Sequence, residues 1–239
     1  MISPEKHDAL QAGWVRLMDK YGISPADAYP VFDRLAAAHS EPARHYHTLE
    51  HVAEMLRVAG RLLEPANDGD AIQLAVWFHD AVHDPRAKDN EARSAELMMD
   101  ALAPFSLPAG LIQHVAEMIL ATDHLPPLAA TNHLPPLARG GRGGADLIAA
   151  ADTAVLLDAD LAILAADEWR YLKYAEAIRN EYAWVDDAAY RTGRAAVLQA
   201  FLDRPRIYRT ARFHDMGDGP ARRNMAAEIG RLAAGQNPV

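Results

Sequence analysis

Apolar residues recur along most of the chain at spacings near 3.6 residues, which is the period of one face of an α-helix. The segment 48–64 shows this period most clearly. Its apolar positions are Leu49, Val52, Met55, Leu56 and Leu62. No segment shows sustained alternation of β-branched and polar residues, the pattern that predicts a half-buried strand. The pattern therefore predicts an all-α protein.

Several helix boundaries carry local signals. Ser24 followed by Pro25 predicts an N-cap and first turn of a helix that runs towards Ala38. A mostly apolar helix is expected from Asp70 to His83, where an Asp-Pro pair ends it. Further helices are expected at about 89–102, 108–122, 145–165, 167–183, 187–202 and 219–234.

One short duplication interrupts the helical pattern. The eight residues 122–129 return with one change as residues 131–138, and a glycine-rich run follows at 139–144. Because the unit is far shorter than a solenoid repeat, we expect a tandem duplication in an exposed, mobile loop at about 125–144. No other boundary is apparent. We therefore expect a single domain over residues 1–239, with a core at about 24–165 and a C-terminal helical extension at about 167–239.

Composition narrows the class of protein. Lys and Arg total 24 against 33 Asp and Glu, so the net charge is −9. This charge argues against binding of extended nucleic acid. The N-terminus lacks the apolar run of a secretory signal, and aspartates break the most apolar stretch, 147–164, so we expect no membrane span. The absence of cysteine excludes disulfides and fits a reducing compartment. We expect a cytoplasmic protein and leave a homo-oligomer open.

The histidines are clustered, since six of the eleven fall between residues 39 and 83. His47 and His51 are four residues apart and share one helix face. The adjacent pair His79 and Asp80 lies at the C-terminal end of the predicted apolar helix. Two imidazoles and a carboxylate from two helices can supply three ligands to one divalent cation. The alternative without metal is a buried, hydrogen-bonded polar cluster.

A fourth ligand is expected from Asp158 or Asp160, which lie in an otherwise apolar segment. Carboxylates are costly to bury there unless they are paired or bind metal. One of the two is therefore expected to bind the cation, and the other to hold a ligand histidine in its tautomer. Helix capping or a salt bridge is the alternative for each.

Taken in order, these motifs resemble the HD-domain superfamily of helical, metal-dependent phosphohydrolases, which is named for its His-Asp doublet. The core segments are Tyr46-His47-xxx-His51-Val52, Phe78-His79-Asp80 and Asp158-Ala-Asp160-Leu. Other segments are similar to an uncharacterised bacterial branch of predicted HD phosphohydrolases. They are Asn90 to Ala95, Ile119 to Thr122, Leu157 to Leu164, Ile178 to Tyr182 and Ala221 to Asn224. The resemblance covers about residues 46–228.

The resemblance implies an HD-domain helical bundle and assigns ligands within it. It selects His51 over His47 as the first histidine, and His79 and Asp80 as the doublet. It leaves Asp158 and Asp160 both as candidates, with a slight preference for Asp158. The ion stays open among Mn²⁺, Mg²⁺, Fe²⁺, Co²⁺, Ni²⁺ and Zn²⁺.

The implied reaction is hydrolysis of a small phosphate ester, with nucleotides among the candidates, by a metal-activated water. The residues expected to take part in catalysis are Asp80, Glu91 and His47. Those expected to bind the substrate are Arg44, His83 and Arg179. Glu91 has a second interpretation, as a favourable charge in the first turn of its helix.

Two other functions stay open. An HD-fold di-iron oxygenase would need further histidines in the site, for which His83, His114 and His124 are available. A non-catalytic module would keep the metal for structure or for ligand sensing.

Overall fold

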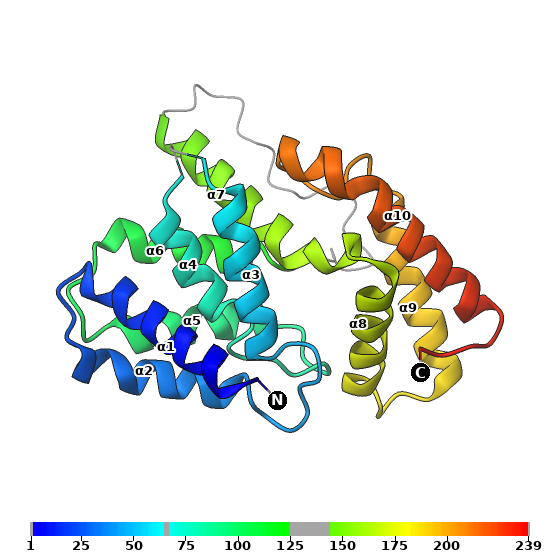
Figure 1. Ribbon diagram of the computed structural model, residues 1–239, viewed down its shortest axis with the longest axis horizontal. Coiled ribbons are helices and arrows are strands. Elements are labelled where there is room, and N and C mark those ends of the chain that lie inside the picture. The colour runs from blue at the N-terminus through cyan, green and yellow to red at the C-terminus, as the bar shows by residue number, and fades with distance from the viewer. Residues whose placement is uncertain (1, 65–66, 125–143, 239) are drawn as a thin grey trace.

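The computed structural model describes residues 2–64, 67–124 and 144–238, and these form ten α-helices, one short 3-10 helix and no strand (Figure 1). The prediction of an all-α protein is thereby confirmed. None of the helices in these ranges combines the length and the apolar character needed to cross a bilayer. The mobile loop expected at about 125–144 lies outside the described residues, except for Gly144, which begins a helix.

Seven helices precede the 3-10 helix. They are α1 (Pro4–Asp19), α2 (Pro25–Ala38), α3 (Leu49–Leu62), α4 (Gly69–Phe78), α5 (Asn90–Leu102), α6 (Ala109–Leu120) and α7 (Gly144–Asp160). The 3-10 helix η1 (Leu161–Ala165) directly continues α7. Three helices follow, α8 (Glu168–Glu181), α9 (Asp187–Leu202) and α10 (Ala211–Ala233).

The helices differ from the sequence prediction in one additional helix, one helix end and one helix start. Helix α1 was not predicted, although Ser3 and Pro4 open it with the same N-cap and proline signal that Ser24 and Pro25 give α2. Helix α4 ends at Phe78, so the doublet follows the helix instead of lying within it. Helix α10 begins before residue 219, because the Thr210 side chain caps it by accepting the N–H of Phe213.

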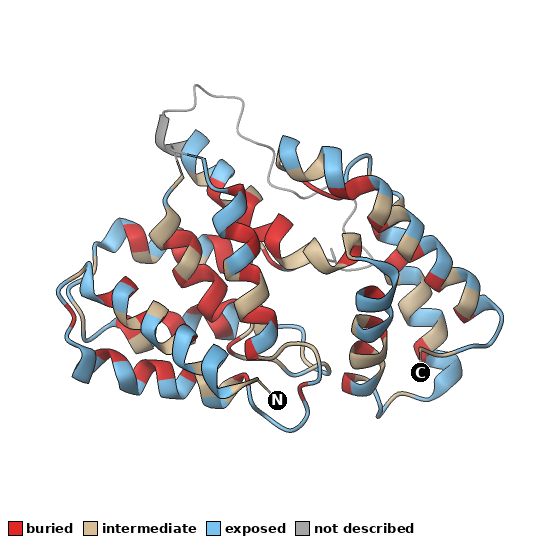
Figure 2. Ribbon diagram, viewed as in Figure 1, coloured by how far each residue is buried: buried red, intermediate tan, exposed pale blue. Residues whose placement is uncertain are grey.

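The helices α1 to α7 share one hydrophobic core, with α4 at its centre. Figure 2 shows that burial is concentrated on α4 and on the faces of the helices around it. The aromatic rings of Trp14 and Phe32 each meet Trp77 edge-on, with ring centroids 5.7 Å apart in both pairs. Such pairs contribute about 0.5–1.5 kcal/mol beyond area burial. This packing fixes the C-terminal end of α4, from which the doublet projects.

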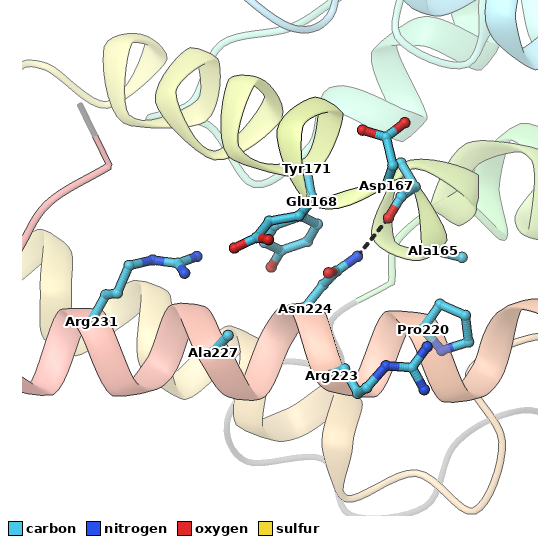
Figure 3. A pocket seen from close by; sticks show the side chains of 10 residues that line it. Ala165, Asp167, Glu168, Tyr171, Pro220, Arg223, Asn224, Ala227 and Arg231 are labelled. Carbon is cyan, nitrogen blue, oxygen red and sulfur yellow. Dashed lines mark hydrogen bonds between the residues drawn. The ribbon is translucent and has the colours of Figure 1, made fainter.

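A second hydrophobic cluster lies among η1, α8, α9 and α10. Asn224 of α10 donates to the carbonyls of Leu164 and Ala166, at 2.9 and 2.8 Å, and so ties η1 to α10. A hollow of about 520 Å³ lies beside this contact, with Arg223 and Arg231 among its lining residues (Figure 3). None of the sequence-predicted site residues lines it. The candidate chemistry lies instead where α8 meets the first core.

Candidate metal centre

Four side chains from three parts of the chain meet beside the C-terminal end of α4. His51 comes from the first turn of α3, His79 and Asp80 follow α4, and Asp160 is the last residue of α7. Nε2 of His51 lies 3.3 Å from Nε2 of His79 and 3.1 Å from Oδ1 of Asp160. Nε2 of His79 lies 3.0 Å from Oδ2 of Asp80 and 3.9 Å from Oδ1 of Asp160.

The separations among His51, His79 and Asp80 fit ligands around one cation, and Asp160 lies beside this group in contact with His51. Donor atoms about 2.1 Å from an ion and at angles between 90° and 110° lie about 3.0–3.4 Å apart. Nδ1 of His79 lies 3.0 Å from the carbonyl of Val76 and can donate to it, which leaves the Nε2 lone pair of His79 directed at the cluster. That lone pair faces a second imidazole nitrogen and two carboxylates, an arrangement that needs a positive charge at its centre.

The pKa values of the two histidines reflect that need. Burial lowers the pKa of His79, but the charge of Asp80 and its hydrogen bond outweigh burial and raise the pKa to about 9. Burial lowers the pKa of His51, and the contact with Asp160 only partly offsets it. In the absence of an ion, a proton on His79 would balance the carboxylates, so binding of a cation would have to displace that proton.

Arg44 holds the two segments that carry the histidines. Its guanidinium donates to the carbonyl of Asp80 at 2.5 Å, of Ala81 at 3.1 Å and of His47 at 3.3 Å. Its Nε donates to Glu41 at 3.1 Å, and the side chain is almost fully buried. The donors of Arg44 thus face main-chain carbonyls and Glu41, while the residue also lines a cleft beside His51, and the expectation that it binds substrate stays a prediction.

The two aspartates of the Asp-Ala-Asp segment have different partners. Asp158 accepts hydrogen bonds from the N–H of Arg209 at 2.7 Å and from the N–H and hydroxyl of Thr210 at 2.8 and 2.7 Å. Burial raises its pKa despite these bonds. Residues two apart in a helix point to nearly opposite sides, so only Asp160 reaches the histidines. The preference for Asp158 is corrected accordingly: it supports the start of α10.

His124 also contacts the centre. Its Nε2 lies 2.7 Å from Oδ2 of Asp160, the oxygen that does not face His51. Burial raises the pKa of Asp160, but hydrogen bonds from His124 and His51 outweigh burial and lower it well below its ordinary value. The sequence offered His124 as an available further ligand, but the neighbouring duplication left its role open.

A second group lies beside the first and consists of His47, His83 and Glu181, whose ligand atoms are within 4.8 Å of one another. Nδ1 of His47 is 2.7 Å from Oε2 of Glu181, and Nε2 of His83 is 3.5 Å from the same oxygen. The rings of His47 and His83 lie against each other at an interplanar angle of 32°, with centroids 4.1 Å apart. Nε2 of His47 lies 3.9 Å from Oδ2 of Asp80, which connects the two groups.

The other predicted residues lie outside both groups. Glu91 is in the first turn of α5 and belongs to neither histidine group found among the described residues. Arg179 donates to the carbonyls of Tyr182 and Val185, at 2.7 and 3.1 Å, and to Asp187 at 2.8 Å. Arg179 thus joins the end of α8 to the start of α9, and its expected contact with substrate stays a prediction.

A cleft of about 840 Å³ has His51 of the first group in its lining. His51 and Tyr46 line it on one side, and Arg170, Lys173 and Tyr174 of α8 line it on the other. The ring of Tyr46 lies against both His51 and Tyr174, with centroids 4.8 and 4.7 Å away. A small molecule in this cleft would therefore contact His51 and two basic side chains.

Comparisons with protein-family models, with curated proteins and with solved structures found no match to this chain. What the structure itself shows is an all-helical protein with two neighbouring, largely buried histidine-rich groups that can each hold a metal ion.

Proposed function

We propose that this protein is a metal-dependent phosphohydrolase of the HD-domain type, acting on a small phosphate ester. The observation that carries the proposal is the convergence of His51, His79 and Asp80 at ligand spacing, with Asp160 in contact with His51 and with His51 in the lining of a cleft. The order of these residues along the chain matches the motif order of that superfamily.

The proposed cation is held by two imidazole nitrogens and two carboxylates. This donor set suits Mn²⁺, Fe²⁺, Co²⁺, Ni²⁺ or Zn²⁺ better than Mg²⁺, which prefers an all-oxygen shell. When bound, the ion would polarise a phosphoryl oxygen and lower the pKa of a water. His79 is held in the ligating tautomer by the carbonyl of Val76, and Asp160 is oriented by His124.

His47 is the residue best placed to transfer a proton. Its Nε2 lies 3.9 Å from Oδ2 of Asp80, too far for a direct hydrogen bond but close enough for one oxygen atom to contact both. An imidazole in that place can accept a proton from a water or donate one to a leaving oxygen. Glu91 takes no part in this proposal.

The cleft supports a small anionic substrate. Arg170 and Lys173 project from α8 towards it, and each is paired with a carboxylate, Glu54 at 3.0 Å and Glu176 at 2.8 Å. A phosphate group can compete for such half-exposed cations, because surface ion pairs are weak. The net charge of −9 argues against extended nucleic acid as the substrate.

The test combines metal analysis with a substrate screen. We expect the purified protein to contain close to one equivalent of a transition metal and to hydrolyse one or more nucleotides or other phosphate esters. Replacing Asp80 by Ala should remove both the metal and the turnover. Full turnover by a metal-free Asp80→Ala protein would rule the mechanism out. Bound metal without turnover on any ester would favour a non-catalytic module.

The second group gives a specific reason to keep one alternative, a two-metal oxygenase. His47, His83 and Glu181 supply a further set of nitrogen and oxygen donors next to Asp80. Two equivalents of iron per chain together with oxygen consumption would support that function over hydrolysis.

A further inference from the structure

Glu181 connects α8 to the turn that carries His47. It is the last residue of α8, and its side chain is fully buried. Its Oε1 accepts the N–H groups of three successive residues, His45 at 2.8 Å, Tyr46 at 2.7 Å and His47 at 3.0 Å. Its Oε2 lies 2.7 Å from Nδ1 of His47. One carboxylate therefore holds both the backbone and the ring of His47.

This arrangement selects one tautomer of His47. An ionised carboxylate only accepts hydrogen bonds, so Nδ1 of His47 must carry the proton that it shares with Glu181. Burial raises the pKa of Glu181, but the charge of His47 and the hydrogen bonds outweigh burial and keep Glu181 ionised. Burial lowers the pKa of His47, but the charges of Asp80 and Glu181 outweigh burial and raise it. When the charged ring gives up one proton, Nδ1 keeps the proton shared with Glu181, and the Nε2 lone pair faces Asp80, whose Oδ2 is 3.9 Å away.

We propose that Glu181 is a positioning residue for the reaction, which fixes the turn at residues 45–47 and turns the Nε2 lone pair of His47 towards the metal centre. This rests on the proposed function, in which His47 transfers a proton. The Glu181 side chain reaches from the helices of the second hydrophobic cluster to the turn beside the first. The same contacts therefore pack α8 against that turn and orient His47 for proton transfer.

The competing role for the same residues is a second cation site. Glu181, His47 and His83 have the right donor types for one, and the buried Nε2 of His83 has no hydrogen-bond partner among the described residues. Three of the hydrogen bonds to Glu181 nevertheless come from backbone N–H groups, which need the carboxylate whether or not an ion is present. We therefore assign Glu181 to the hydrogen-bonded role.

The decisive variant is Glu181→Gln. If the amide oxygen keeps the backbone N–H groups, the amide NH₂ faces Nδ1 of His47, and His47 must move its proton to Nε2. We expect kcat to fall at least about 100-fold, the usual size of a general acid–base contribution, with KM changed less than about threefold. The metal content should stay at the wild-type value. Nitrogen NMR of ¹⁵N-histidine protein, with the His47 signals assigned from a His47→Gln spectrum, should show the change of tautomer.

Asp152→Asn is the matched control. Asp152 is also a buried carboxylate that accepts a backbone N–H, that of Asp68 at 3.1 Å, and it lies 3.0 Å from Nε2 of a histidine, His114. It lies about 12 Å along α7 from Asp160, because a helix rises about 1.5 Å per residue. Asp152→Asn should lower stability and leave kcat per folded molecule at the wild-type value.

The double variant His47→Gln, Glu181→Gln separates positioning from a general loss of structure. If Glu181 acts through His47, its replacement in the His47→Gln background should lower kcat no further. Additive losses in the double variant, or a wild-type kcat in Glu181→Gln, would overturn the proposal. Loss of one metal equivalent in Glu181→Gln would assign the residues to a second cation instead. Should the wild-type protein hydrolyse no phosphate ester, the hydrolase proposal fails, while the tautomer of His47 still tests Glu181.

Discussion

Oδ1 of Asp160 lies 3.1 Å from Nε2 of His51 and joins the end of α7 to the first turn of α3 across the candidate metal centre. Asp158, two positions before Asp160, faces the opposite way and accepts the N–H groups of Arg209 and Thr210, just before α10. Helix α7 therefore carries two aspartates in a similar sequence context but with different structural roles. A substitution of Asp158 can serve as the control for the same substitution of Asp160.

Asp160→Asn should weaken metal binding by about 100-fold or more, because it removes a charged ligand as well as the contact with His124. Isothermal titration with Mn²⁺ or Zn²⁺ measures this directly. Asp158→Asn should leave the affinity for metal unchanged and lower the free energy of unfolding by about 1–3 kcal/mol, since backbone donors at residues 209 and 210 lose their acceptor. An equal loss of metal affinity in the two variants would contradict this assignment.

His124→Ala tests a residue that orients a ligand without binding the ion in our proposal. Removal of the 2.7 Å contact frees the Asp160 carboxylate to rotate, so the affinity for metal should fall by about 10–100-fold while the fold is kept. Competition with a chelator of known affinity measures the change. If His124 were itself a ligand, the loss would match that of Asp160→Asn.

The sequence predicted the all-α class, most helix positions and the cluster of His51, His79 and Asp80, because these rest on local periods and on adjacent residues. It could not choose between Asp158 and Asp160. Both lie in the same apolar segment, and the choice depends on the helix phase of α7 and on residues 209 and 210, which are distant in sequence.

Two further site features needed tertiary information. Glu181 meets His47 across 134 residues of sequence separation, and no local pattern marks that pairing. Arg44 was expected to bind phosphate because an arginine near a histidine cluster has the right chemistry for it. Whether its donors face a substrate or main-chain carbonyls depends on how the turn after α4 packs against the turn before α3.

Arg44→Met should impair both folding and the metal centre. The variant leaves the carbonyls of Asp80, Ala81 and His47 without their buried donor, so the free energy of unfolding should fall by about 2–4 kcal/mol. The doublet also loses its tether, so the affinity for metal should fall in the molecules that remain folded. Arg179→Met is the control, because Arg179 makes similar carbonyl contacts between α8 and α9. It should lower stability in urea unfolding and leave the affinity for metal intact.

His39 should make the protein sensitive to mild acid. The side chain is buried, with ring nitrogens 3.4 Å from the carbonyls of His47 and Trp77. Burial, with the nearby charge of Arg44, lowers its pKa from 6.5 to about 3. Between pH 6.5 and 3 the His39 side chain is therefore protonated in the unfolded chain but neutral in the folded one. Its contribution to the free energy of unfolding is fully present above pH 6.5 and is lost as the pH falls towards 3.

Between pH 7.5 and 5.5 this single residue should lower the free energy of unfolding by about 1.4 kcal/mol. This change in the free energy of unfolding depends little on the pKa of His39 in the folded chain, provided that this pKa lies well below 5.5. Other groups titrate in the same interval, so the measurement is the difference between wild type and His39→Gln in urea unfolding at the two pH values. Gln cannot be protonated, and the variant should lose less stability on acidification than wild type by that amount. Parallel losses in the two proteins would mean that His39 is protonated as readily in the folded chain as in the unfolded one.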